Sequence, residues 1–176
     1  MTTIAARRVN GKVKMAWDSQ VTSGRTATHG MNKVVKINGQ FAVGVAGHLR
    51  YANLVHRASV SKIHDHDILQ SDFDGYGWIC DVLIPAWMKS IRGEKQALAE
   101  EEPDLPWGHS LIALAGSIYS VGADFSVTAT GEFGSIGSGS PFAMTAMHLG
   151  KTAKASVEVA KELDLYTGGE VKEMTV

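Results

Sequence analysis

The sequence predicts a single α+β domain. Its expected elements come in groups (strands, two helices, strands, two helices, strands) and do not alternate as in a doubly wound parallel sheet. Two Asn-Gly pairs between β-branched runs predict hairpins near the start of the chain. A length of 176 residues with 44% hydrophobic and 20% charged side chains fits one domain, residues 1–176, with a substantial core.

The two hairpins follow from alternating apolar runs on either side of the Asn-Gly pairs. Asn10-Gly11 favours a type I′ turn between the first two strands, and Asn38-Gly39 repeats the signal between the next two. The strands are expected over Thr2–Ala6, Val13–Trp17, Val34–Ile37 and Phe41–Val45.

Apolar residues then recur at helical spacing. One helix is expected from His48 and a second over Trp78–Ile91. Pro85 should kink the second helix or mark its start, because proline lacks the N–H that a helix interior needs. Gly75 and Gly77 lie where a turn between the two helices is expected.

The second half of the chain follows the charged, proline-bearing connector Glu100–Trp107. Pro141 favours the first turn of a helix, a further helix should end near Leu163, and strands over Leu165–Thr167 and Val171–Val176 should close the chain. Between the connector and Pro141, short strands are expected over Ser110–Ala115, Ile118–Val121, Phe125–Thr128 and Phe133–Ile136.

Charge and cysteine content narrow the function classes. Seventeen basic and eighteen acidic side chains give a formal charge of −1, so no overall field favours nucleic acid or an anionic membrane as partner. Cys80 is the single cysteine, which excludes an intramolecular disulfide, and Arg7 and Arg8 precede any signal-like apolar segment. No apolar run approaches the ~20 residues of a membrane span. We therefore expect a cytoplasmic protein.

The start of the chain carries candidate chemistry. Removal of Met1 would leave Thr2 with a hydroxyl nucleophile and a free α-amine, whose ordinary pKa of about 7.7 to 8.0 suits a general base. The remaining requirements are a cation that keeps the amine neutral and a carboxylate that holds the cation, and Asp18 and Lys33 are available. If Met1 stays, the Thr2 amine is in a peptide bond and this chemistry fails.

Four motifs in order resemble the proteasome β-subunit family, which includes the HslV-type bacterial peptidases. They are TTIAARRVNGKVKMAWDSQVTSG, NKVVKINGQFAVGVAG, GSIGSGSPFA and LDLYTGG, and together they extend over nearly the whole chain. The resemblance implies a four-layer αββα sandwich, the N-terminal-nucleophile hydrolase fold. It also implies a threonine-type endopeptidase that uses no metal or organic cofactor.

The resemblance assigns roles to individual residues. Thr2 matches the nucleophile, Asp18 in AWDSQ the catalytic aspartate, and Lys33 in NKVVKI the catalytic lysine. Gly47 matches the residue whose backbone N–H binds the oxyanion. The family usually has a small residue next to this glycine, whereas this chain has the bulky His48.

Ser138 and two residues near the C-terminus complete the implied catalytic set. The spacing of Gly134 and Gly139 superficially suggests a phosphate loop, but Ser140-Pro141 follows where that motif needs Lys and then Ser or Thr. The resemblance instead places Ser138 beside the nucleophile. Asp164 and Thr167 in LDLYTGG match proteasome positions that support this serine, and an alternative interpretation makes them only a helix end and a strand start.

The resemblance also implies an apolar S1 pocket, which would favour cleavage after apolar residues with broad specificity. The side chains on the family's pocket positions are Val21, Met31, Val35, Val45 and Leu49.

Two rival functions remain open. The HDHD segment, residues 64–67, offers four candidate metal ligands, although residues two apart on a helix point to different sides and a solvated helix end also explains the segment. The other rival is a catalytically inactive ring subunit with the same fold. For an active enzyme, the resemblance implies self-assembly into stacked rings, an AAA+ unfoldase ATPase as a possible partner, and unfolded proteins or peptides as substrates.

Overall fold

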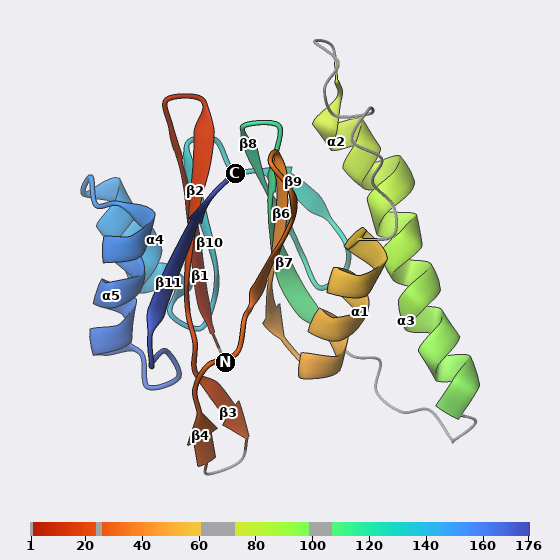
Figure 1. The fold of residues 1–176 in the computed structure, drawn as a ribbon, viewed down its shortest axis with the longest axis horizontal. Helices are drawn as coiled ribbons and strands as arrows, with labels where there is room; N and C mark the ends of the chain where they lie inside the picture. The colour runs from red at the N-terminus through yellow and green to blue at the C-terminus, as the bar shows by residue number, and fades with distance from the viewer. Residues whose placement is uncertain (1, 24–25, 61–72, 99–106) are drawn as a thin grey trace.

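A computed structural model describes residues 2–23, 26–60, 73–98 and 107–176 (Figure 1). One antiparallel sheet holds the N-terminal hairpin at its centre, with strand order β10-β1-β2-β11. The strands are β10 (Phe133–Gly137), β1 (Thr3–Val9), β2 (Lys12–Asp18) and β11 (Val171–Thr175). At the turn of the hairpin, Asn10 and Gly11 have φ of 51° and 75°, which agrees with the predicted type I′ turn.

The second sheet is also antiparallel and has the order β5-β6-β7-β8-β9. Its strands are β5 (Val34–Asn38), β6 (Phe41–Gly47), β7 (Gly108–Leu114), β8 (Ser117–Val121) and β9 (Val127–Ala129). A short hairpin that the sequence patterns did not predict, β3 (Val21–Ser23) with β4 (Thr26–Thr28), extends beyond the first sheet (Figure 1).

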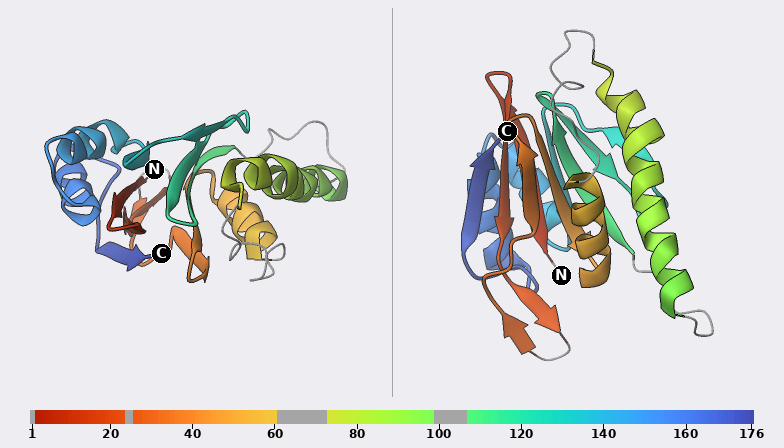
Figure 2. Two further views of the ribbon diagram at one scale, coloured as in Figure 1. Left: turned by 90° about the horizontal axis from the view of Figure 1, so that it is seen from above. Right: turned by 45° about the vertical axis from the view of Figure 1, so that its right-hand side comes forward.

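Helices cover the outer faces of the two sheets, which lie face to face (Figures 1 and 2). The second sheet packs against α1 (Leu49–Val60) and α3 (Ile84–Leu98), and the first against α4 (Ser140–His148) and α5 (Ala153–Leu163). The α+β prediction is confirmed, and in this structure the described elements form helix, sheet, sheet and helix layers.

Successive side chains of β1 and β6 point to opposite faces of their sheets, which explains the layers. Ile4 belongs to the apolar cluster between the sheets, whereas its neighbour Ala5 packs against α4 and α5. On β6, Ala42 faces the other sheet and Val43 faces α1 and α3. Both faces of each central strand are therefore buried, which requires nearly continuous apolar residues there.

The helical region before α3 differs from the prediction. Gly75 and Gly77 do not form a turn between helices, because the Asp74 side chain accepts a hydrogen bond from the Gly77 N–H and starts α2 (Gly75–Trp78). A π-helical segment, η1 (Ile79–Leu83), then joins α2 to α3. Pro85 lies just after this segment, where the wider turn accommodates a residue that has no N–H to donate.

Two further predictions are corrected. Residues 165–167 are not a strand, because the Asp164 side chain accepts from the Tyr166 N–H and its carbonyl from the Thr167 N–H, which holds a turn. The hairpin at Asn38-Gly39 forms, but neither residue has positive φ, so its turn is not type I′. There Gln40 N–H donates to the Asn38 side chain, next to an irregularity in the strand pairing.

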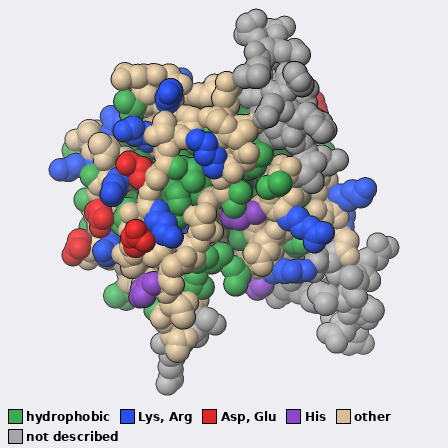
Figure 3. All heavy atoms as spheres, in the orientation of Figure 1, with side chains coloured by type: hydrophobic (Ala, Val, Ile, Leu, Met, Phe, Trp, Pro, Cys, Tyr) green, Lys and Arg blue, Asp and Glu red, His purple; other side chains and the backbone are tan. Residues whose placement is uncertain are grey.

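The surface in Figure 3 intermixes basic and acidic side chains over the first sheet and its helices, in line with the near-zero net charge. Within the described ranges, no helix is long and apolar enough to cross a bilayer.

Candidate active site

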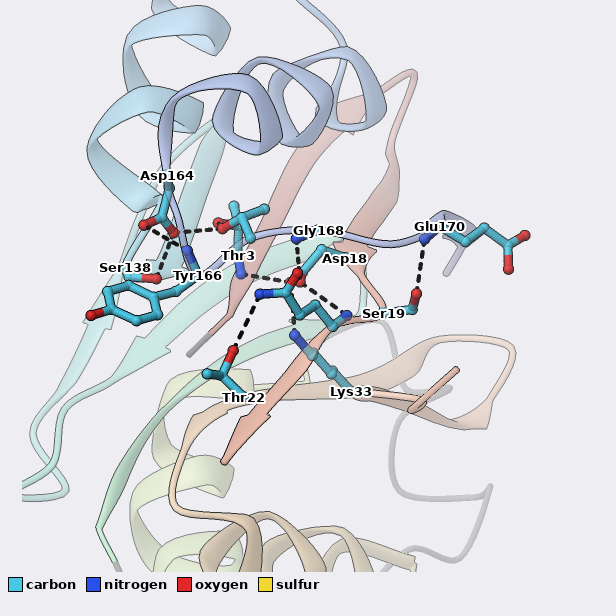
Figure 4. Close-up of polar contacts among 12 residues, drawn as sticks. Thr3, Asp18, Ser19, Thr22, Lys33, Ser138, Asp164, Tyr166, Gly168 and Glu170 are labelled. Carbon is cyan, nitrogen blue, oxygen red and sulfur yellow. Dashed lines mark hydrogen bonds and ion pairs between the residues drawn. The ribbon is translucent and has the colours of Figure 1, made fainter. Parts of the chain in front are cut away.

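Asp18 is a buried carboxylate that accepts hydrogen bonds with both of its oxygens. It ends β2, is 0% exposed, and receives four hydrogen bonds. Its Oδ1 accepts from the Thr3 N–H and from Lys33 Nζ, each at 2.8 Å, and its Oδ2 accepts from the backbone N–H groups of Gly168 (3.1 Å) and Gln20 (3.2 Å) (Figure 4). Three different segments of the chain thus converge on one carboxylate.

Lys33 enters the site from the segment just before β5, and only 3% of it is exposed. Burial lowers the pKa of Lys33, while the charge and hydrogen bond of Asp18, and more weakly the charge of Asp164, act in the opposite direction. Lys36, the other cation of this segment, points away and donates to the Thr175 carbonyl. The structure therefore brings the predicted lysine, and not its neighbour, to Asp18.

Thr2 immediately precedes β1 and is 6% exposed. It lines an open cavity of about 620 Å³ together with Gly47, Ser138 and residues of both sheets. Gly137 permits this placement, since it has φ of 96° and a Cβ there would overlap the Thr2 carbonyl. The full lining is Thr2, Ala46, Gly47, His48, Trp107, His109, Ser120, Ser135, Ile136, Gly137, Ser138 and Ser140.

Gly47 ends β6 beside this cavity. Its φ is 140°, and a Cβ would come within 2.5 Å of the Gly108 Cα, so the position requires glycine. The next residue, His48, donates its N–H to the Trp107 carbonyl, and its Nδ1 accepts from the Arg50 N–H at 3.3 Å. His48 is exposed and lines the cavity. Its ring also satisfies the Arg50 N–H, which would otherwise lack a partner in the first turn of α1.

A second carboxylate, Asp164, lies just after α5 and accepts hydrogen bonds from two hydroxyl groups. Its Oδ2 accepts from Ser138 Oγ and from Thr167 Oγ1, both at 2.6 Å. Thr167 Oγ1 is also 2.6 Å from Thr3 Oγ1. Figure 4 shows Ser138 beside Asp164. Ser138, Asp164 and Thr167, which the sequence analysis grouped, are therefore in direct contact.

The five residues predicted to form the S1 pocket do not line the cavity beside Thr2. Val45 is 4% exposed and packs with α1 and α3, and Val35, opposite Val43 in the strand pairing, lies on the same face of the sheet. Leu49 is 49% exposed at the first position of α1. Val21 and Met31 are partly exposed. An S1 pocket at these residues stays a prediction.

Sequence reasoning missed several contributors to this region. Thr3 was expected only as part of the first strand, Thr2–Ala6, although it is bonded directly to the candidate nucleophile. Trp107 and His109 reach the cavity because β7 pairs with β6, with His109 opposite Ala46. An aromatic residue next to Gly108 was the available signal, but only the strand pairing places it near Thr2.

The metal alternative falls on residues 64–67, which lie outside the described residues. In the parts of the chain that are described, no cluster of three or more His, Cys, Asp or Glu side chains could hold a metal ion.

No protein-family model and no curated protein matches the chain. Solved structures do. BPH, a bacterial proteasome homologue from Thiobacillus denitrificans, in complex with epoxomicin, matches with a TM-score of 0.74 at 20% identity over 99% of this chain and 98% of that one. The chain has the proteasome-like fold of BPH and HslV.

Two further structures agree. BPH in a second structure also gives a TM-score of 0.74, at 20% identity over 99% of this chain and 97% of that one. Eukaryotic HslV from Trypanosoma brucei gives 0.70 at 20% identity over 99% of this chain and 98% of that one. The match to HslV and BPH extends from the N-terminal hairpin to β11, so it includes every segment that contributes to the site.

Proposed function

We propose that this chain is an N-terminal threonine peptidase of the HslV and proteasome type, with Thr2 as nucleophile after removal of Met1. The observation that carries the proposal is the buried contact of Lys33 with Asp18 at 2.8 Å, because the same carboxylate oxygen accepts the N–H of Thr3, the residue bonded to Thr2. A buried cation and anion are thereby held within one residue of the candidate nucleophile.

In the proposed reaction, Thr2 Oγ attacks the scissile carbonyl carbon and passes its proton to the Thr2 α-amine. The Gly47 N–H stabilises the oxyanion. Collapse of the intermediate breaks the C–N bond, and the protonated amine of Thr2 returns the proton to the leaving nitrogen. A water molecule, deprotonated by the same amine, then hydrolyses the ester and restores Thr2.

Lys33 and Asp18 tune this base. A positive charge beside the Thr2 amine favours its neutral form, which is the form that accepts a proton. Asp18 favours the charged form of Lys33 against the cost of burial. Ser138, oriented by Asp164 and Thr167, would relay protons between the hydroxyl and the amine.

Unfolded proteins or peptides are the proposed substrates, cleaved after apolar residues if Val21, Met31, Val35, Val45 and Leu49 form the S1 pocket. We further propose a cytoplasmic assembly of stacked rings, fed by an AAA+ ATPase, by analogy with HslV. Negative-stain microscopy of the purified protein tests the rings. A sample that stays monomeric at micromolar concentration contradicts them.

The decisive experiment is intact mass spectrometry before and after incubation with epoxomicin, the compound present in one BPH structure. Closure of the peptide-epoxyketone adduct needs both a free α-amine and the threonine hydroxyl. We expect loss of Met1 and one adduct per chain, with no adduct on Thr2→Ala. Retained Met1 without an adduct, in protein from its natural host, would contradict the peptidase and favour a noncatalytic ring subunit.

A further inference from the structure

We propose that Thr3 is a positioning residue that links two sets of contacts. Its hydroxyl joins the Asp164 group, which consists of Asp164, Ser138 and Thr167, and its backbone N–H joins the Asp18–Lys33 pair. This inference rests on the proposed function, because it concerns how the same nucleophile is held. Thr3 is 0% exposed and directly follows Thr2 in the chain.

Thr3 bonds to both groups at once. Its backbone N–H donates to Asp18 Oδ1 at 2.8 Å, and the same oxygen accepts Lys33 Nζ. Its side-chain Oγ1 lies 2.6 Å from Thr167 Oγ1, which contacts Asp164. Figure 4 shows Thr3 between the two carboxylates.

The direction of these hydrogen bonds follows from proton counting. Each hydroxyl has one proton to donate, and those of Ser138 and Thr167 both point to Asp164 Oδ2. The oxygen of Thr167 can therefore only accept from Thr3, so the Thr3 hydroxyl is the donor at the end of this chain of hydroxyls.

The Thr3 hydroxyl also packs against the loop that carries Ser138. Thr3 pairs with Gly137 across the β1–β10 ladder, and a Cβ on Gly139 would overlap Thr3 Oγ1. Ser138 lies between these two glycines. The hydroxyl thus lies against the segment that carries Ser138, while Asp164 accepts the hydrogen bond of the serine side chain.

The expected consequence concerns the reaction more than substrate binding. Thr3 is absent from the cavity lining, so its loss should leave contacts with substrate in place. Without its hydroxyl, Thr167 loses a buried donor, and the orientation of Ser138 relative to Thr2 loosens. We expect kcat to fall about tenfold, the effect of roughly one buried hydrogen bond, with KM changed less than about twofold.

The test compares Thr3→Val, which keeps the side-chain shape without the hydroxyl, with Thr3→Ser, which keeps the hydroxyl. Thr175→Val, at an exposed position of β11 that does not line the cavity, is the matched control. The measurements are kcat and KM on a fluorogenic peptide, the rate of epoxomicin adduct formation, and Tm. Thr167→Val and the double variant complete a double-mutant cycle.

The inference is supported if Thr3→Val lowers kcat and the adduct rate, Thr3→Ser restores both, and the double variant loses no more than Thr167→Val. It is overturned if Thr3→Val keeps the wild-type kcat, or if the two losses simply add. If Thr3→Val does not fold, the same criteria apply to Thr3→Ala, measured below its Tm. A wild-type chain that forms no adduct contradicts the proposed function itself, whereas a reactive wild type with an equally reactive Thr3→Val contradicts only this inference.

Discussion

Asp18 and Asp164 lie on either side of Thr3 but are held by different chemistry. Asp18 is fully buried and bonds to one cation and three backbone N–H groups. Asp164 is partly buried, and its side chain accepts from two hydroxyls and one backbone N–H. The first carboxylate depends mainly on the backbone path of three segments, and the second depends on which side chains the sequence supplies.

The contrast separates two contributions to the proposed reaction. The charge of Asp18 offsets a buried lysine, so its removal should damage both the fold and the activity. Asp164 orients hydroxyl protons near the surface, so its removal should mainly slow the reaction.

Asp18→Asn should have the largest effect. It leaves Lys33 buried beside a neutral amide, and breaking a buried pair in this way costs about 3–5 kcal/mol of unfolding free energy. Urea denaturation measures the loss, with the exposed Asp81→Asn as control. Equal midpoints for the two variants would contradict the structural role of the pair.

Lys33→Met should destabilise the chain less, by about 2 kcal/mol, because Asp18 keeps its three backbone donors. The activity should still fall by roughly 10²-fold or more, since the base loses its neighbouring cation. Peptide hydrolysis and denaturation of the same samples measure both effects, with Lys36→Met as control. A variant with full activity would remove Lys33 from the proposed mechanism.

His56 on α1 extends the comparison to a half-buried group that has no charged partner among the described residues. Burial lowers its pKa from 6.5 to about 4, and its Nε2 is buried without a hydrogen-bond partner among the described residues. The folded state therefore favours the neutral imidazole of His56. Protonation of His56 does not reduce the free energy of unfolding above pH ~6.5. As the pH falls towards ~4, the free energy of unfolding decreases by about 2 kcal/mol, after allowance for the partial exposure of the side chain.

Unfolding free energies of wild type and His56→Gln between pH 7 and ~4 isolate that loss. The wild type should lose stability relative to the variant as the pH falls. Parallel pH curves would show that His56 does not titrate on unfolding.

Asp164→Asn should have the smallest effect on stability, about 1 kcal/mol, because the group is partly exposed and the amide still accepts one hydroxyl. We expect kcat to fall about tenfold with KM nearly constant. Steady-state kinetics measure both constants, with Glu162→Gln, an exposed neighbour, as control. A change in KM alone would assign Asp164 to substrate binding instead.

Local patterns predicted the parts of the fold whose signals are contained in a few residues. Asn10-Gly11 formed the expected turn, and Pro141 lies in the first turn of α4. The predictions that were wrong depended on competing local bonds. The Asp74 cap made Gly75 helical, and the Asp164 side chain held residues 165–167 in a turn.

By itself, the sequence determined the α+β grouping and the opening hairpin, because both depend on residue type and short-range order. The candidate set of Thr2, Asp18 and Lys33 came from the resemblance of the sequence motifs to the proteasome β-subunit family. The tertiary structure alone decided that Lys33 meets Asp18, that Thr3 joins Asp164 through Thr167, and that Trp107 and His109 wall the cavity. The Lys33–Asp18 contact joins residues 15 positions apart, and the Thr3–Thr167 contact joins residues 164 positions apart. Their geometry arises from strand pairing and from burial between the sheets, which no local pattern contains.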